Sequence, residues 1–183
     1  LEISHDWETK PLGAICENLD SKRRPITKNV RTASQFPYYG ASGIVDQVDG
    51  FLFDEPLLLV SEDGANLLAR STPIAFSVSG KIWVNNHAHV LRFPDMATQK
   101  FVERYLNSIS LENYVTGAAQ PKLNQQALNS IPIPLPPLPE QRRIVAELDA
   151  EAAQIEAVRA LIPRYEAKIQ RVLARVWGTA PVA

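Results

Sequence analysis

An apolar heptad repeat near the end of the chain is the strongest constraint on its fold. Leucine, isoleucine or valine recurs every seven residues from Leu148 to Val176, and a second apolar series starts at Ile144. Only Glu151 interrupts the second series, and Arg and Glu occupy the outer faces. This pattern predicts one long helix that pairs with another helix along an apolar seam. The predicted seam residues are Ile144, Leu148, Ile155, Val158, Ile162, Tyr165, Ile169, Val172 and Val176.

Prolines and a glycine set the expected limits of this helix. Pro139 suits the first helical position, and Gly178 suits the residue that follows the last turn. A helix over 139–177 would be roughly 58 Å long. Pro163 lies inside it, and an internal proline costs ~3 kcal/mol, so we expect a bend or break there. The heptads are too long and strict for a helix packed on its own domain, and the partner is either another copy or another segment of a longer polypeptide.

The chain before the helix mixes short β-like runs with Gly and Asp turns, which predicts an α+β, mixed α/β globular domain with a β-sheet core. Helices are expected from a Thr98 cap through Leu106, and from Asn124 toward Leu128. Prolines alternate through 131–139, which favours an extended connector or an edge strand. We therefore divide the chain into a domain at 1–137, a helix at 138–178 and a tail at 179–183. The strand candidates are 57–60, 74–79, 81–84 and 88–93.

Charge and cysteine content restrict the class of protein. The formal net charge is −1, but five cations between Lys22 and Arg31 have no acidic residue among them. A local basic surface is therefore expected rather than a uniformly basic molecule. The single cysteine, Cys16, cannot form an internal disulfide, which favours a reducing cytoplasm. No apolar run approaches the ~20 residues that span a bilayer, and residues 1–4 do not resemble a signal peptide. The first residue is not Met, which is compatible with a fragment of a longer chain.

The sequence offers no catalytic motif. It has no Gly-x-Gly-x-x-Gly, no P-loop, and no Asn-Pro-Pro-Tyr or Asp-Pro-Pro-Tyr of an amino-methyltransferase. A loose nuclease-like pattern at Pro94–Asp95 needs Glu166 and Lys168, which fall on the distant heptad helix. His87 and His89 share a strand face without a third metal ligand, and Cys16 has no base nearby. We therefore expect neither catalysis, nor a metal, nor a cofactor bound by this chain.

Three segments carry a resemblance to a known family. The first comprises Trp7–Cys16 and Pro37–Val45, the second is Leu57–Asn66, and the third runs from Thr116 to Ile144 with its alternating prolines. Together they resemble a specificity subunit of a Type I restriction-modification system, and the resemblance covers nearly the whole chain. The third segment is the most specific of the three.

The resemblance implies a non-catalytic, sequence-specific reader of double-stranded DNA in the cytoplasm. In such subunits two target-recognition domains each read half of a split target, and two paired helices set the gap between the halves. The helices dock modification subunits, which carry S-adenosylmethionine and methylate adenine at N6, and restriction subunits join the full complex. This chain carries the pattern once. It is therefore either a fragment that pairs with a missing second half or a half-subunit that pairs with a second copy; a dimer would favour a palindromic split site.

Candidate DNA contacts fall into phosphate-binding and base-reading groups. The cations between positions 22 and 31 are phosphate candidates, although each is about as often part of a solvated loop. Asn85, Asn86 and His87 are base-reading candidates, because Asn can pair bidentately with adenine, but a turn held by Asn side chains is an alternative. Tyr38 is equally compatible with a packed hairpin. The full set is Lys22, Arg23, Arg24, Lys28, Arg31, Tyr38, Tyr39, Ser42, Arg70, Lys81, Asn85, Asn86, His87, Gln120 and Lys122.

A coiled-coil protein-interaction adaptor without DNA binding is the alternative function. The heptad helix fits both functions, whereas the basic cluster and the three-segment resemblance favour DNA. Salt-sensitive retention on duplex DNA would separate the two.

Overall fold

The computed structural model describes residues 7–117 and 119–178. Residue contacts divide the chain into two units, which meet between Arg142 and Arg143. Helix α4 (Leu138–Trp177) begins in the first unit and forms most of the second. No helix among the described residues is both long enough and apolar enough to cross a bilayer.

A four-stranded antiparallel sheet forms the centre of the first unit. Its strand order is β2-β9-β6-β7, and every side chain of β6 is buried. The run Leu57–Val60 is apolar throughout because it meets protein on both faces. Helix α2 (Met96–Ser108) packs on β6 and β7. The strands are β2 (Glu17–Asn18), β6 (Leu57–Ser61), β7 (Ala75–Val78) and β9 (Ala88–Arg92).

A second four-stranded sheet has the order β4-β3-β8-β5, in which β3 and β8 are parallel and the other pairs are antiparallel. One apolar cluster includes Phe53 and Ile82 of this sheet together with Leu57 and Val90 of the first, so both sheets share a core. Helix α1 (Asn66–Ala69) follows β6. The strands are β3 (Phe36–Gly40), β4 (Gly43–Val48), β5 (Phe53–Asp54) and β8 (Lys81–Val84).

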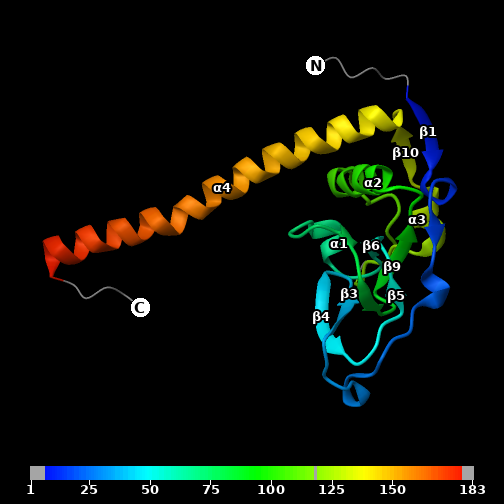
Figure 1. Cartoon of the computed structure of the whole chain (residues 1–183), viewed down its shortest axis with the longest axis horizontal. Coiled ribbons are helices and arrows are strands. Elements are labelled where there is room, and N and C mark those ends of the chain that lie inside the picture. The colour runs from blue at the N-terminus through cyan, green and yellow to red at the C-terminus, as the bar shows by residue number, and fades with distance from the viewer. Residues whose placement is uncertain (1–6, 118, 179–183) are drawn as a thin grey trace. The chain divides into compact units, whose positions relative to one another are not determined.

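The proline-rich segment closes the first unit as an edge strand. Strand β10 (Pro132–Leu135) pairs antiparallel with β1 (Glu8–Pro11) in a separate two-stranded sheet (Figure 1). This confirms the edge-strand interpretation, and proline suits such a position because an edge strand leaves some N–H groups without a ladder partner. Helix α3 (Gln125–Ser130) precedes β10 and confirms the short helix expected from Asn124 toward Leu128. The Asn124 side chain caps this helix by accepting the Ala127 N–H.

The mixed α/β architecture and all four strand candidates are confirmed, but one helix cap was wrong. The Asp95 carboxylate, not Thr98, caps α2 and accepts the N–H groups of Ala97 and Thr98, each at 2.9 Å. Thr98 is instead a buried residue of the first turn that donates its hydroxyl to Asp95. Asp and Thr can both cap a helix. Asp95 is the cap because its backbone is extended and the helix begins at the next residue, whereas Thr98 already lies inside the helix.

Helix α4 ends at Trp177 as expected, and Gly178 takes the left-handed conformation with φ of 64°. It starts at Leu138, one residue before the predicted Pro139. Of the bend or break expected at Pro163, the break was wrong, because the helix is continuous through this residue. The bend stays a prediction. The seam residues from Leu148 to Val176 are 44–62% exposed in this single chain. Gln141 is the buried residue of α4 among those described. The tail at 179–183 lies outside the described residues.

Candidate nucleic-acid interface

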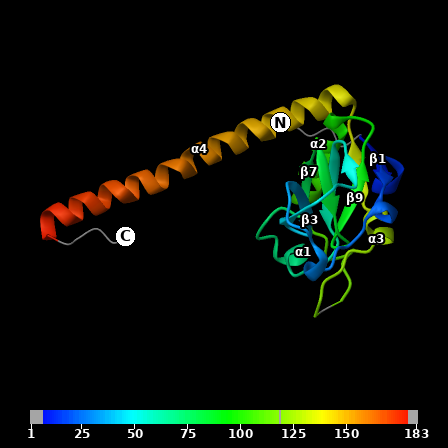
Figure 2. The ribbon, with the colours of Figure 1, turned by 60° about the horizontal axis from the view of Figure 1, so that its bottom comes forward.

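Four loops that are distant in the sequence meet at one end of the two sheets. They are Tyr39–Ser42 at the end of β3, Ser61–Gly64 at the end of β6, Asn85–His87 after β8, and residues 116–117 and 119–122 between α2 and α3. We call these residues the loop cluster. In Figure 2 the segment between α2 and α3 projects at the lower edge of the first unit, on the side that carries α1.

Backbone hydrogen bonds fix the loop cluster. The Asn85 N–H donates to the Tyr39 carbonyl at 3.0 Å, and the Glu62 N–H donates to the His87 carbonyl at 2.9 Å. The Gly64 N–H donates to the Pro121 carbonyl at 3.0 Å. Main-chain bonds of this kind make the four loops one connected surface rather than four independent ones.

The cluster presents mainly polar side chains to solvent. The side chains of His87 and Lys122 are 48% and 53% exposed, and each contacts one carboxylate. His87 Nδ1 lies 2.7 Å from Asp63 Oδ2, and Lys122 Nζ lies 3.2 Å from Glu62 Oε1. Ser42, Asn86 and Gln120 are also exposed. Amides, a hydroxyl and an imidazole at one surface are the groups that hydrogen-bond to base edges.

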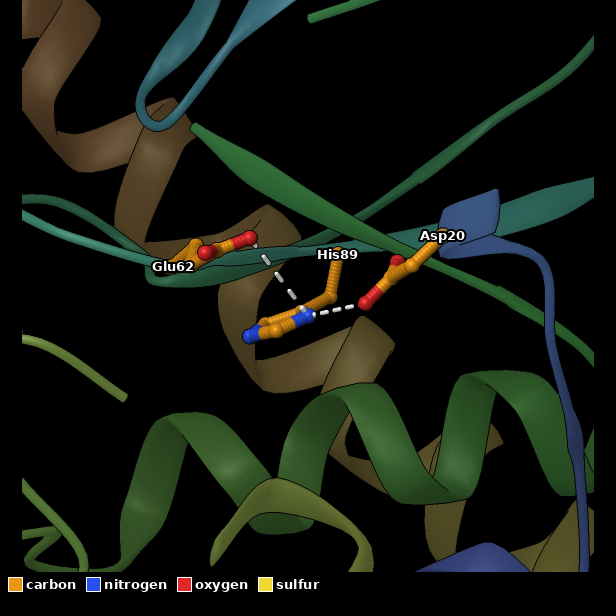
Figure 3. Close-up of side chains that lie close together, drawn as sticks. All are labelled: Asp20, Glu62 and His89. Atoms are coloured by element: carbon orange, nitrogen blue, oxygen red, sulfur yellow. Dashed lines mark hydrogen bonds and ion pairs between the residues drawn. The ribbon is translucent and has the colours of Figure 1, made fainter. Parts of the chain in front are cut away.

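An ionic network made of Asp20, Arg23, Glu62, His89 and Lys122 supports this surface from within. Figure 3 shows Asp20, Glu62 and His89 converging from three separate segments of the chain. Arg23 Nη1 lies 2.6 Å from Glu62 Oε2 and donates to the Ala88 carbonyl at 2.7 Å. Arg23 is therefore a bridge between the N-terminal segment and the loop cluster, with a side chain only 13% exposed.

The histidine of the network is fully engaged. His89 is 1% exposed; its Nδ1 lies 2.5 Å from Asp20 Oδ2, and its Nε2 lies 2.8 Å from the Leu123 carbonyl oxygen. Both neighbours are oxygen atoms that accept hydrogen bonds, so the ring is held on both sides. The triad of Asp20, Glu62 and His89 has the donor types of a metal site. It does not suit a divalent metal, because both imidazole nitrogens already contact oxygen atoms of the chain. The two carboxylates already bind Arg23 and Lys122.

The carboxylates of the network ionise more readily than usual. Burial raises the pKa of Asp20, but the hydrogen bond and positive charge of His89, the Val90 N–H and Arg23 outweigh burial and lower that pKa. Burial likewise opposes ionisation of Glu62, and Arg23, His89 and Lys122 lower its pKa overall. Asp20 and Glu62 are therefore ionised at neutral pH, and their contacts couple the positions of the loops to one another.

A basic segment, residues 22–31, contacts strands β8 and β3 of the second sheet. Trp83 Nε1 donates to the Arg24 carbonyl at 2.6 Å, and the Ile26 N–H donates to Tyr38 Oη at 2.9 Å. Lys22, Arg24 and Lys28 are exposed. Arg31 instead lies 4.5 Å above the Tyr38 ring and binds the Asp46 carboxylate. Three of the five predicted phosphate contacts are thus exposed, whereas Arg23 and Arg31 bind groups within the chain.

Several predicted contact residues have structural roles. Tyr38 is 1% exposed, so its side chain belongs to the core, as the packed-hairpin alternative stated. Arg70 has φ of 53° and donates to the carbonyls of Leu106 and Ile109, which caps the end of α2. Lys81 Nζ lies 4.9 Å from the Phe51 ring centre. Asn85 is 6% exposed, and Tyr39 is half-buried with its ring 6.1 Å from that of Phe76.

Sequence reasoning missed the acidic half of the site. Asp20 and Glu62 bind Arg23, and Asp63 binds His87, although the sequence treats both partners as available to DNA. Val45 also reaches the loop cluster from β4. The sequence placed Asp20 two residues before the basic segment, which was a usable signal for an ion pair.

Cys16 is partly buried and donates its thiol to the Leu12 carbonyl; burial, and then the charge of Asp20, raises its pKa to about 12. It is therefore a poor nucleophile.

The chain belongs to the family described as the Type I restriction modification DNA specificity domain, whose sequence model matches residues 4–162. Among individual relatives, a type I restriction enzyme specificity subunit of Haemophilus influenzae is 36% identical over 146 residues, which are 80% of this chain and 37% of the relative. This family is a DNA-specificity family, as the three-segment resemblance predicted.

Solved structures share the fold at low sequence identity. The S subunit of a Type I restriction-modification system from M. genitalium has a TM-score of 0.67 at 17% identity, covering 96% of this chain and 46% of its own. A chain from a study of type I R-M complex assembly has a TM-score of 0.69 at 19% identity, covering 94% and 45%. The HsdS subunit from Thermoanaerobacter tengcongensis has a TM-score of 0.59 at 19% identity. The chain spans less than half the length of these relatives.

Proposed function

We propose that this chain is the non-catalytic DNA-reading part of a type I restriction-modification system and reads one half of a split target. The family match over residues 4–162 carries this proposal. The convergence of four polar loops on one surface gives it a physical basis, because sequence is read by side-chain contacts to base edges. The chain itself then needs no cofactor, and S-adenosylmethionine belongs to the modification partner.

Phosphate contacts and base contacts are assigned to different segments. Lys22, Arg24 and Lys28 are exposed, so they suit phosphate contacts, although the charge of Lys28 also acts on Asp46. Asn86, His87 and Gln120 are exposed on the loop cluster and suit base-edge contacts. Lys122 and Ser42 border them. The acidic Asp63 beside His87 disfavours phosphate there, which supports the division of roles.

The first test is methylation mapping of DNA from cells that contain this chain and its modification partner. We expect one methylated motif. Replacing Lys22, Arg24 and Lys28 by Gln should lower methylation at all sites and leave the motif unchanged, since phosphate contacts carry no sequence information. Replacing Asn86 by Ala should relax the motif at one base pair. A wild-type chain that directs no methylation, or a motif indifferent to Asn86, would refute the assignment.

The exposed heptad face of α4 supports pairing with a second helix. Ile155, Ile162 and Ile169 are 53%, 53% and 57% exposed along one seam. A continuous apolar stripe exposed to water is typical of a surface that packs against a partner. Pairing would hold two reading domains at a set distance and provide a surface for the modification subunit; restriction subunits would join that complex. The partner helix belongs either to a second copy or to a second half of a longer chain.

Mass in solution tests the pairing. A dimeric wild-type chain would assign the seam to a second copy, and a monomer would assign it to a different half. In a dimer, Ile155→Asp with Ile169→Asp should cause dissociation, because two carboxylates would be buried in each helix. Ala160→Asp with Ala167→Asp places the same charges off the seam and should leave the mass unchanged. Equal behaviour of the two double variants would exclude the seam as the interface.

A further inference from the structure

Two side chains from different strands converge above a single glycine in the loop cluster. Gly40 ends β3 and is buried. A Cβ atom at this position would lie 3.1 Å from Val45 Cγ1 and 3.3 Å from Asn85 Nδ2. The absence of a side chain at Gly40 therefore lets a valine from β4 and an amide from the end of β8 approach the same point.

A bulge in the hairpin accounts for the position of Val45. In the β3–β4 pairing, Tyr38 lies opposite Asp46 and Tyr39 lies opposite Ile44, which leaves Val45 as the extra residue. A bulge re-aims the side chain of the extra residue and interrupts the ladder beside it. Val45 remains 55% exposed although it is purely aliphatic, so the bulge holds an apolar group in an otherwise polar surface.

Asn85 is held rigidly, with its oxygen already used. Its Oδ1 accepts the His87 N–H at 2.8 Å, and its own N–H donates to the Tyr39 carbonyl. The residue is 6% exposed, and within the described part of the chain its Nδ2 group makes no hydrogen bond, although it is not one of the fully buried atoms without a partner. An amide donor that solvent still reaches can exchange that solvent for the acceptor of a ligand. The engaged oxygen also disfavours the bidentate adenine contact expected from sequence.

We propose that Val45 and Asn85 together form a specificity-determining contact for a thymine in the major groove. Thymine presents an O4 acceptor beside its 5-methyl group, which matches an N–H donor beside an isopropyl group. Cytosine offers an N4 donor instead, and guanine offers O6 without a methyl group. The inference rests on the proposed DNA-reading function and names one base pair of its target.

Methylation mapping with the full chain and its modification partner tests the contact. The wild-type motif should contain a thymine at one position, and Val45→Ala should reduce selection of that thymine about fourfold, as expected from lost methyl contact worth ~0.8 kcal/mol. Asn85→Asp keeps the oxygen that binds the His87 N–H and replaces the donor by an acceptor. It should shift that same position toward cytosine or adenine, which carry amino donors. Ile44→Ala, one residue away and 58% exposed, is the matched control and should leave the motif unchanged.

A chemical substitution in the DNA keeps the test independent of protein folding. In duplexes of the mapped motif, deoxyuridine at the thymine position removes only the methyl group. The complex with the modification partner should bind the substituted duplex about fourfold more weakly. The complex with the Val45→Ala chain should show little further loss. If the wild-type chain yields no motif, the proposed function fails. If it yields a motif that Val45→Ala, Asn85→Asp and deoxyuridine leave unchanged, only the thymine contact is refuted.

Discussion

Replacing Arg23 by Met tests whether the ionic network holds the first unit together. The guanidinium binds Glu62 at 2.6 Å, the Ala88 carbonyl at 2.7 Å and the Asp20 carbonyl at 3.1 Å. Methionine keeps most of the apolar volume and removes all of these donors. Glu62 and Asp20 would then remain nearly buried as carboxylates, and each would have lost the Arg23 guanidinium as a cationic partner.

The expected loss of unfolding free energy is about 3 kcal/mol. Removing one partner of a buried ion pair costs about 3–5 kcal/mol. The lower end applies because the Arg23 and Glu62 side chains remain 13% and 12% exposed, and Lys122 still lies 3.2 Å from Glu62. With a urea slope of about 2 kcal/mol per molar, the midpoint of unfolding should fall by about 1.5 M.

The pH dependence gives the prediction a second measurable part. The folded-state pKa values of Asp20 and Glu62 are lowered, so their contribution is complete above the ordinary carboxyl range near pH 4 and is lost as pH falls through the lowered values. Without Arg23, both pKa values should rise toward their ordinary range. The difference in unfolding free energy between wild type and variant should therefore narrow between pH 7 and pH 3.

Urea unfolding followed by tryptophan fluorescence at several pH values measures both effects. The exposed neighbour Lys22→Met serves as the control and should remain within about 0.5 kcal/mol of wild type. An Arg23→Met chain that unfolds within 0.5 kcal/mol of wild type at pH 7 would refute the reasoning. A gap that stays constant down to pH 3 would show that the carboxylates are not coupled to this arginine.

Two further predictions concern single residues. Asp95→Ala should lower the unfolding free energy measured in urea by about 1 kcal/mol, because two N–H groups of α2 lose their acceptor. Thr98→Val should lower it by less. A larger loss for Thr98→Val than for Asp95→Ala would show that Thr98 is the cap. Because burial raises the Cys16 pKa to about 12, a thiol reagent at pH 8 should modify the native chain slowly and the urea-unfolded chain rapidly; equal rates would contradict the buried thiol.

The elements of this fold were predictable because their signals are local. The apolar run at Leu57–Val60, the Asn124 cap and the end of α4 at Gly178 each depend on a few adjacent residues. Pro163 was misjudged for a related reason. The rule that proline ends a helix describes local cost, and the rest of a 40-residue helix can offset that cost.

The site was predictable only in part, because charge partners come from distant segments. Arg23 and Lys22 are adjacent and chemically alike in sequence, yet one is nearly buried against Glu62 and the other is exposed. Besides nearby Asp20, the partners that bury Arg23 are Glu62 and the Ala88 carbonyl, which lie 39 and 65 positions away. Sequence therefore identified a basic segment correctly without identifying which cations remain available to phosphate.

Val45 shows why a reading surface is harder to predict than a core. Strict alternation along β4 would place neighbouring side chains on opposite faces of the sheet. One extra residue in the strand moves every following side chain to the opposite face. The register shift between Tyr38 and Tyr39 arises from the pairing of β3 with β4. It therefore cannot be predicted from the sequence of β4 alone. A bulge also changes which side chain stands beside Asn85 without altering any loop residue. Among related chains, changes at the bulge would then alter the base read while the ionic network beneath the loops stays the same.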